Sequence, residues 1–311
     1  MSWMRTSTLE STAIPAAPAT AAGIAARLRD YSELTKPRIT SLVVLTTYVG
    51  FHLGAVGPFG WGFVAHLLTG TALACGGTSA LNQWWERDRD ALMRRTRNRP
   101  LPGARLGADE ALAFGVAVTI AGLLELAMFV NLLAAIVTAV TLVIYVFAYT
   151  PLKTRTWLCT VVGAVPGALP PVIGWAAARG TLDVGAWSLF AIMFVWQLPH
   201  FYAIAWMYRE DYARGGFAML PVVDPTGRAT TRHIVVWSLA LVPVSLLPAI
   251  FGLSGAWYAT GAVALGLGFV ALAAVLAAHG SLPHARRVFL GSILYLPVLF
   301  GLLVLDKIPL R

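Results

Sequence analysis

Charged residues are scarce in this sequence. Asp, Glu, Lys and Arg make up only 12% of its 311 residues, whereas 58% of the residues are hydrophobic. A soluble globule of this size needs many more polar side chains to cover its surface. The mean hydropathy of +0.72 agrees with this. The composition therefore argues against a soluble protein, and we predict that a lipid bilayer covers most of the surface.

Cysteine is almost absent too. Cys75 and Cys159 are the only two, and both lie in or beside apolar segments. Two such thiols provide neither a disulfide framework nor the spacing of a cysteine metal site. We expect them to pack as small residues.

Acidic residues are the scarcer of the two charge types, with 14 Asp and Glu against 23 Lys and Arg. A net charge of +9 can indicate nucleic-acid binding. In a membrane protein, however, the side of the bilayer on which the cations lie is the first explanation to test. We predict no nucleic-acid partner.

Nine apolar segments are long enough to cross a bilayer, which takes about 20 helical residues. They are predicted at residues 39–58, 61–85, 111–129, 132–150, 158–176, 187–206, 233–251, 257–278 and 288–305. No long polar segment interrupts them, so we predict an all-α fold for residues 31–311, a bundle of nine transmembrane helices with a lipid-accessible central cavity. Residues 1–30 lack the apolar core of a signal peptide, and we predict a disordered cytoplasmic arm there.

The basic residues lie on alternate connections between these spans. Of the 23 Lys and Arg, 20 are in the N-terminal arm and in the loops after spans two, four, six and eight. By the positive-inside rule these segments face the cytoplasm, which places the C-terminus outside. We predict a multi-pass protein of the bacterial plasma (inner) membrane, with the mitochondrial inner membrane as the alternative.

A group of oxygen-bearing side chains follows span two. Asn82, Glu86 and Asp90 are spaced four residues apart, so they share one face of a helix over about two turns. Asp88 falls on a different face. Several oxygen donors without His or Cys suit Mg²⁺, which binds through one or two carboxylates and substrate phosphates.

Six arginines follow within the same region, and guanidinium groups suit phosphate recognition. An ordinary basic loop beside lipid headgroups explains many of them equally well. It does not explain the acidic face, because acids contribute little to membrane orientation.

A second polar group begins near the end of span six. If the helix continues, Gln197, His200, Tyr208 and Asp211 lie within an arc of about 80°. A polar stripe that descends into the bilayer should face a cavity. For His200, a structural contact with a neighbouring helix is the main alternative. The prolines at positions 166, 170 and 171 predict a kink in span five.

Four segments of the chain resemble the UbiA-type intramembrane prenyltransferases. They are LTKPRI at Leu34–Ile39, the Asn82–Leu101 stretch with RRTRNRPL, YTPLK at Tyr149–Lys153, and PHFYAIAWMYREDYARGGFAMLP at Pro199–Pro221. The resemblance extends over nearly the whole chain. It implies that Mg²⁺, held by Asn82, Glu86 and Asp90 and assisted by Asp211, binds a prenyl diphosphate.

Two positions depart from the family's pattern. Glu86 stands where the family more often has Asp, which leaves the mode of metal coordination open. The second acidic motif of the superfamily is represented by Glu210 and Asp211 between two tyrosines, which leaves a second metal ion open.

Within the family, the likeness is to members that farnesylate heme. It implies farnesyl diphosphate as donor, a vinyl group of heme b as acceptor, heme O as product, and a heme-handling or oxidase-assembly protein as partner. The implied catalytic residues are Asn82, Glu86, Asp90, His200, Tyr208 and Asp211, with Tyr208 stabilising the allylic cation and His200 facing the acceptor. The candidate substrate-binding residues are Lys36, Arg38, Arg87, Arg94, Arg97, Lys153 and Gln197.

Two other functions stay open from the sequence. One is the same chemistry on another aromatic acceptor, such as a quinone precursor or a chlorin. The other is transport, since polar residues within kinked helices also mark transport pathways. The acidic groups lie near one face of the membrane rather than at its midplane, which favours the enzyme.

Overall fold

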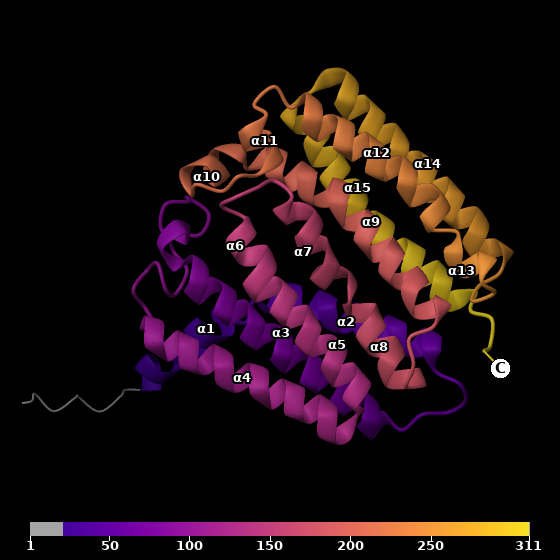
Figure 1. Ribbon diagram of the computed structural model, residues 1–311, viewed down its shortest axis with the longest axis horizontal. Coiled ribbons are helices and arrows are strands. Elements are labelled where there is room, and N and C mark those ends of the chain that lie inside the picture. The colour runs from indigo at the N-terminus through magenta and orange to yellow at the C-terminus, as the bar shows by residue number, and fades with distance from the viewer. Residues whose placement is uncertain (1–20, 311) are drawn as a thin grey trace, which may run out of the picture.

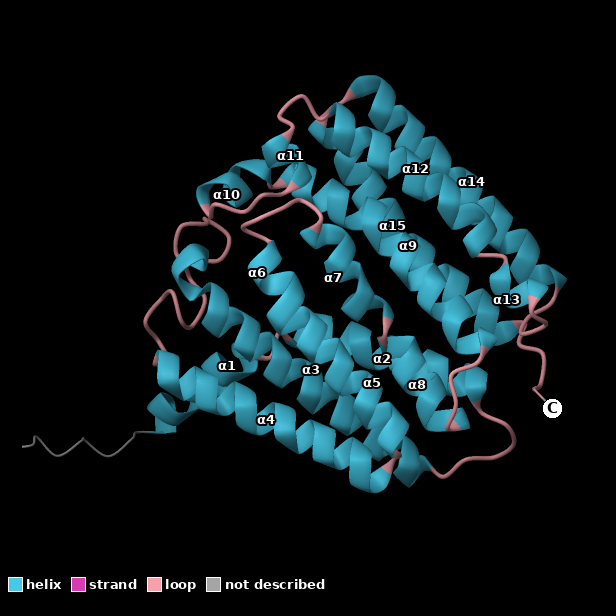
Figure 2. Ribbon diagram, in the orientation of Figure 1, coloured by secondary structure: helices cyan, strands magenta, loops and turns pink. Residues whose placement is uncertain are grey.

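The computed structural model describes residues 21–310, and they form a bundle of helices (Figures 1 and 2). The first helix, α1 (Ala21–Leu34), precedes the spans. Six spans are single helices: α2 (Pro37–Gly54), α3 (Trp61–Asp90), α4 (Ala108–Phe129), α9 (Val184–Met207), α14 (Ala256–His279) and α15 (Leu282–Leu305). Three spans are divided: α5 (Leu132–Val143), η1 (Ile144–Tyr149) and α6 (Thr150–Leu152); α7 (Cys159–Ala168) and α8 (Pro170–Arg179); α12 (Arg228–Val244) and α13 (Leu247–Ile250). Two short helices, α10 (Arg209–Arg214) and α11 (Leu220–Val223), lie between α9 and α12.

The predicted all-α membrane fold is confirmed. Among the described residues, eight helices are long and apolar enough to cross a bilayer. The first predicted span corresponds to α2, which is not among the eight because Arg38, His52 and several threonines make its 18 residues less apolar. The kink predicted for span five is also present, since α7 ends at Ala168 and Pro170 begins α8.

The predicted N-terminal arm lies mostly outside the described residues, which begin at position 21. Residues 21–30 nevertheless form most of α1. Ion pairs hold this helix to the bundle, Arg27 with Glu110 and Asp30 with Arg105. These partners are distant in sequence, so composition alone gave no sign of them.

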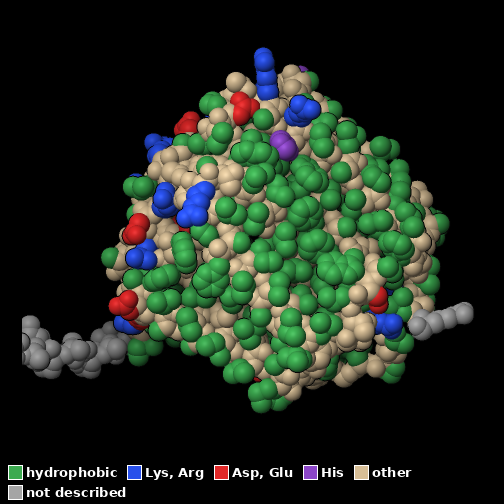
Figure 3. Space-filling view, viewed as in Figure 1, with side chains coloured by type: hydrophobic (Ala, Val, Ile, Leu, Met, Phe, Trp, Pro, Cys, Tyr) green, Lys and Arg blue, Asp and Glu red, His purple; other side chains and the backbone are tan. Residues whose placement is uncertain are grey.

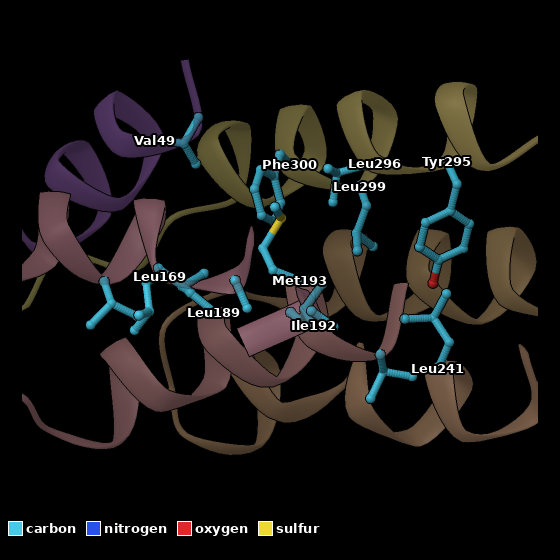
Figure 4. Close-up of a cluster of buried hydrophobic side chains, with 14 of the residues drawn as sticks. Val49, Leu169, Leu189, Ile192, Met193, Leu241, Tyr295, Leu296, Leu299 and Phe300 are labelled. Carbon is cyan, nitrogen blue, oxygen red and sulfur yellow. The ribbon is translucent and has the colours of Figure 1, made fainter. Parts of the chain in front are cut away.

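The two most buried spans are α7–α8 and α9, whose apolar windows are 72% and 61% buried, compared with 28% for α12–α13 and for α14. On α9, Leu189, Ile192 and Met193 lie in an apolar cluster with side chains from several other helices (Figure 4). The labelled members of this cluster from the other helices are Val49, Leu169, Leu241, Tyr295, Leu296, Leu299 and Phe300. The less buried helices carry many exposed large hydrophobic side chains, as expected of helices that face lipid.

Close helix crossings fix the other half of the bundle. Where α2 crosses α8, a Cβ atom added to Gly50 would lie 1.9 Å from the Pro171 carbonyl oxygen, and one added to Gly174 would lie 1.9 Å from the Thr47 oxygen. Small residues that let backbones approach closely are typical of helix contacts in membranes. This crossing fixes the C-terminal half of α2 against α8.

The loops after α3, α6, α11 and α14 lie at one end of the bundle with α1 and α10 (Figure 1), and we call it the basic end. In Figure 3 the charged side chains gather mainly along this rim, whereas hydrophobic side chains cover most of the remaining visible face. The distribution is that of a multi-pass membrane protein with one strongly charged side.

Candidate active site

The last two turns of α3 carry three buried oxygen donors at the basic end. Asn82, Glu86 and Asp90 are exposed by only 1%, 5% and 1%. The Asp88 side chain is 86% exposed, as its helical phase predicts. The sequence spacing therefore separated the inward acids from the outward one correctly.

Each of the three donors contacts a different cation. Lys36 Nζ donates to Asn82 Oδ1 at 3.0 Å. Lys153 Nζ lies 2.7 Å from Glu86 Oε1 and donates to Oε2 at 3.0 Å. Arg99 donates to Asp90 Oδ2 at 2.7 Å. The cations come from the α1–α2 turn, the segment after α6 and the α3–α4 loop, so the fold concentrates both signs of charge around one face of α3.

Lys36 is held in an unusual conformation for this contact. Its φ of 48° and ψ of 63° are left-handed, although it is not glycine and Pro37 follows it. The pKa of the Lys36 ammonium is lowered to about 7, mainly by burial and in smaller part by the nearby charges of Arg99 and Lys153. Strained residues of this kind are frequent at functional sites.

Lys153 is positioned by the divided span before it. Burial by itself would lower the pKa of the Lys153 ammonium, but the adjacent Glu86 carboxylate raises it above its ordinary value. The ammonium also lies 4.5 Å from the centre of the Tyr149 ring. Tyr149 ends the π-helical turn η1, and the next residue, Thr150, accepts a hydrogen bond from Asn82 Nδ2 at 3.1 Å. One helix turn thus contacts both Asn82 and Glu86.

The second acidic motif meets the segment that follows the first. Asp211, on α10, is 9% exposed and accepts a hydrogen bond from the Arg94 backbone N–H at 3.3 Å. Its carboxylate also pairs with Arg214 at 2.9 Å. The Arg95 guanidinium lies 4.4 Å from the centre of the Tyr212 ring and 5.2 Å from that of Tyr208. The expectation that the two motifs share one end of the bundle is met.

His200 and Gln197 are not brought to the carboxylates. The single polar stripe required a continuous helix, but α9 ends at Met207 and the chain bends at Tyr208, with φ −114° and ψ 22°, before α10. The stripe is therefore wrong as a continuous surface. His200 Nδ1 lies 2.7 Å from Ser292 Oγ on α15, and its ring stacks on Trp196. This is the contact with a neighbouring helix that was its alternative.

Gln197 is buried between α9 and α7. Its amide donates to the Met193 carbonyl at 2.8 Å and to the Ala164 carbonyl at 3.4 Å. Its oxygen occupies the space beside Gly167, where an added Cβ would lie 1.9 Å away. These contacts satisfy a polar group inside the bundle.

In the described part of the chain, no side chain of the four candidate substrate-binding arginines contacts the buried carboxylates of the two motifs. Arg87 turns back to its own helix, donating to the Trp84 carbonyl at 2.8 Å. Arg38, Arg94 and Arg97 are exposed, although the Arg94 backbone reaches Asp211. Arg99 and Arg95 are the loop arginines whose side chains contact the two motifs, and the sequence did not single them out.

The donor set fits a magnesium ion by its chemistry. Among the described residues, no group of three or more His, Cys, Asp and Glu is arranged to hold a metal. Mg²⁺ needs only one or two carboxylates when substrate phosphates and water complete its coordination. Glu86 Oε1 is buried, and its one close partner is the Lys153 ammonium at 2.7 Å, so a bound metal ion would share or replace that contact.

Comparisons with known proteins show the family to which the chain belongs. The UbiA prenyltransferase family matches residues 43–300. The chain is 53% identical to protoheme IX farnesyltransferase of Solibacter usitatus over 289 residues, which cover 90% of this chain and 99% of that protein. It is 45% identical to protoheme IX farnesyltransferase of Myxococcus xanthus, over 90% of this chain and 95% of that one.

Solved structures share the fold at much lower identity. A digeranylgeranylglyceryl phosphate synthase has a TM-score of 0.77 at 16% identity, with 91% of this chain and 99% of that chain covered. A UbiA homolog from Archaeoglobus fulgidus, bound to GPP and Mg²⁺, has a TM-score of 0.66 at 16% identity, with 88% and 99% covered. At these identities the similarity is one of fold.

Proposed function

The chain belongs to the UbiA prenyltransferase family, and we propose that it transfers the farnesyl group of farnesyl diphosphate to a vinyl group of heme b, giving heme O for heme-copper oxidases. The observation that carries this proposal is the buried face of Asn82, Glu86 and Asp90, surrounded by three cations at the edge of the membrane domain. The names of the relatives supply the farnesyl and heme specificity. Residues 31–311 then act as one prenyltransferase domain.

Asn82, Glu86 and Asp90 would hold Mg²⁺, with Asp211 assisting from α10. When bound, the ion neutralises negative charge that develops on the leaving diphosphate. In the structure described, Lys36, Lys153 and Arg99 balance the same oxygen donors. When the diphosphate enters, these cations can contact its phosphate oxygens while the metal ion contacts the carboxylates. The charges of the site are then balanced both before and after the substrate binds.

The chemical step replaces one bond of the donor by a bond to heme. The allylic C–O bond breaks and the diphosphate leaves with the electron pair. The first carbon of the farnesyl group bonds to the terminal carbon of the vinyl group, which leaves a cation on the carbon beside the porphyrin ring. Water adds there and loses a proton, giving the hydroxyl group of the product.

The aromatic residues near the motifs support charged groups in this scheme. The Tyr208 and Tyr212 rings hold the Arg95 guanidinium, so we assign Tyr208 to positioning that cation rather than to the allylic cation. His200 acts in the contact between α9 and α15. The residues in contact with the diphosphate are then Lys36, Lys153, Arg95 and Arg99.

The basic end faces the cytoplasm of a bacterial cell in this proposal, and the protein lies in the inner membrane with its N-terminus inside and its C-terminus outside. Positive residues favour that side, and farnesyl diphosphate can reach the carboxylates there while its hydrocarbon tail remains in an apolar environment. A heme-handling or oxidase-assembly protein is the expected protein partner.

An acceptor competition tests the proposal. The purified chain receives farnesyl diphosphate, Mg²⁺ and equal amounts of heme b, a quinone precursor and a chlorin. We expect farnesylation of heme b alone. Prenylation of another acceptor in preference to heme would overturn the heme assignment while keeping the prenyltransferase.

A further inference from the structure

Two histidines face each other at the tip of the hairpin between α14 and α15, and the proposed reaction uses neither. His279 ends α14 and His284 lies in the first turn of α15. Their rings stack with centres 4.7 Å apart and planes inclined by 29°. Gly280, with φ of 61°, makes the tight turn that brings the two helix ends together.

Both histidines form their hydrogen bonds through Nδ1, which leaves Nε2 of the exposed His279 without a hydrogen-bond partner among the described residues. His279 Nδ1 lies 2.9 Å from the Val275 carbonyl oxygen. Because a carbonyl only accepts, Nδ1 carries the hydrogen, and Nε2 of the neutral ring keeps its lone pair. His284 Nδ1 is held by Ser281 Oγ at 2.6 Å. Each ring is thus fixed through Nδ1, an arrangement found behind histidines that ligate metals.

The surroundings of the rings are basic and apolar. Arg286 and Arg287 follow on α15 and are exposed. Residues 256–305 contain no Asp or Glu, so neither α14 nor α15 offers these guanidinium groups an acidic partner. Leu282 is 52% exposed and Leu290 51%. The tip therefore offers an imidazole lone pair for an iron atom, two guanidinium groups for carboxylates, and apolar surface for a flat macrocycle.

We propose that this hairpin tip is a docking site for an iron tetrapyrrole that carries carboxylate side chains. His279 Nε2 is the axial ligand of the iron, His284 is a positioning residue that stacks on it, and Arg286 and Arg287 pair with the carboxylates. The inference rests on the proposed function in one respect, that heme b is the acceptor. The tip lies at the same end of the bundle as α10 and α11 (Figure 1), so it would receive heme on the side of the candidate active site.

The test is a titration of the full-length protein in detergent with ferric heme b, followed in the Soret region. His279→Ala should remove the component with an axial histidine and weaken that binding event by at least ~10-fold. His284→Phe keeps an aromatic ring beside His279 and should preserve the axial-histidine spectrum. Arg286→Ala together with Arg287→Ala should weaken binding while preserving the spectrum.

Controls separate this site from the others. His66→Ala changes a partly exposed histidine near the opposite end of α3 and should leave the titration unchanged. Metal-free protoporphyrin IX should bind wild type and His279→Ala alike, because it cannot use the axial nitrogen. A His279→Ala protein with the wild-type spectrum and affinity would overturn the proposal.

Activity and docking can fail independently. If wild type makes heme O and His279→Ala leaves the heme spectrum unchanged, the docking site is refuted and the proposed function stands. If wild type makes no heme O but His279→Ala still removes the axial-histidine component, the docking site stands and the heme transferase is refuted.

Discussion

At the scale of single residues, the buried donors of α3 are balanced one by one. A charge removed from water without a partner costs several kcal/mol, so buried carboxylates require cations or metals close by. Glu86 and Asp90 each have an ion pair at 2.7 Å. For the same reason, a metal ion that arrives with the diphosphate can replace Lys153 and Arg99 as the partner of these carboxylates.

Substituting one acid on each face of α3 tests the metal assignment. Asp90→Asn should lower turnover by at least roughly 100-fold, because an amide is a weaker magnesium ligand than a carboxylate. Asp88→Asn is the matched control, since its side chain is 86% exposed, and it should retain normal turnover. Steady-state rates with heme b and farnesyl diphosphate give the comparison. Equal rates for the two variants would refute the assignment.

The equivalent change in the second motif is Asp211→Asn. We expect a comparable loss of turnover, because this carboxylate joins α10 to the segment after α3 through Arg94. Circular dichroism should show intact helices. Near-normal turnover in this variant would remove Asp211 from the site.

The pair of Lys153 and Glu86 also predicts a stability effect. Lys153→Met leaves a buried carboxylate unpaired and should destabilise the protein by about 3 kcal/mol. Adding Glu86→Gln removes that charge and should recover most of the loss. Thermal unfolding in one detergent measures both, and a double variant less stable than the single one would contradict the ion-pair explanation.

Sequence reasoning reached the acidic face but not all of its partners. Regular spacing identified Asn82, Glu86 and Asp90 because they lie on a helix with a known period. Arg95 and Arg99 lie in a loop of closely spaced arginines, where no periodicity tells which side chains point inward. Tertiary contacts alone select them.

At the scale of elements, the bend at Tyr208 divides into α9 and α10 a segment that the sequence pattern predicted as one continuous helix. The stretch around it contains no Gly or Pro between Pro199 and Gly215, so the helical pattern gave no signal to stop. The structure ends α9 at Met207 and lays Asp211 on α10. The bend places Asp211 beside the α3–α4 loop instead of along α9.

The crossing of α2 and α8 predicts a sensitive glycine. Gly174→Ala would place its Cβ 1.9 Å from a backbone oxygen, which no rotamer change can relieve, and should cost about 2 kcal/mol. Gly268→Ala on α14 is the control, because its Cβ would meet nothing within 4 Å. Thermal unfolding should show a lower midpoint only for the first. Equal midpoints would show that the two helices separate without cost.

At the scale of the whole molecule, hydropathy predicted the layout of the spans well. Apolar length depends only on local composition, so spans two to nine appear near their expected positions. The packing order of the helices depends on contacts distant in sequence. It was not predicted, and neither was the short helix α1 that ion pairs hold against the bundle.

Removing divalent metal tests whether the reaction at the two acidic motifs needs a metal ion. Excess EDTA should abolish product formation, and added Mg²⁺ should restore it, because the leaving diphosphate then regains its counter-ion. EDTA already saturated with Mg²⁺ is the control. The midpoint of thermal unfolding should change little, since resident cations balance the carboxylates. Full turnover in excess EDTA would show that the reaction needs no divalent metal.

The most direct measurement is the mass of the heme recovered after the purified chain is incubated with heme b, farnesyl diphosphate and Mg²⁺. We predict a heme heavier than heme b by one farnesyl group and one hydroxyl group, with one diphosphate released for each heme converted. Unchanged heme b with no diphosphate released, from protein that is still folded, would contradict heme farnesylation at this site.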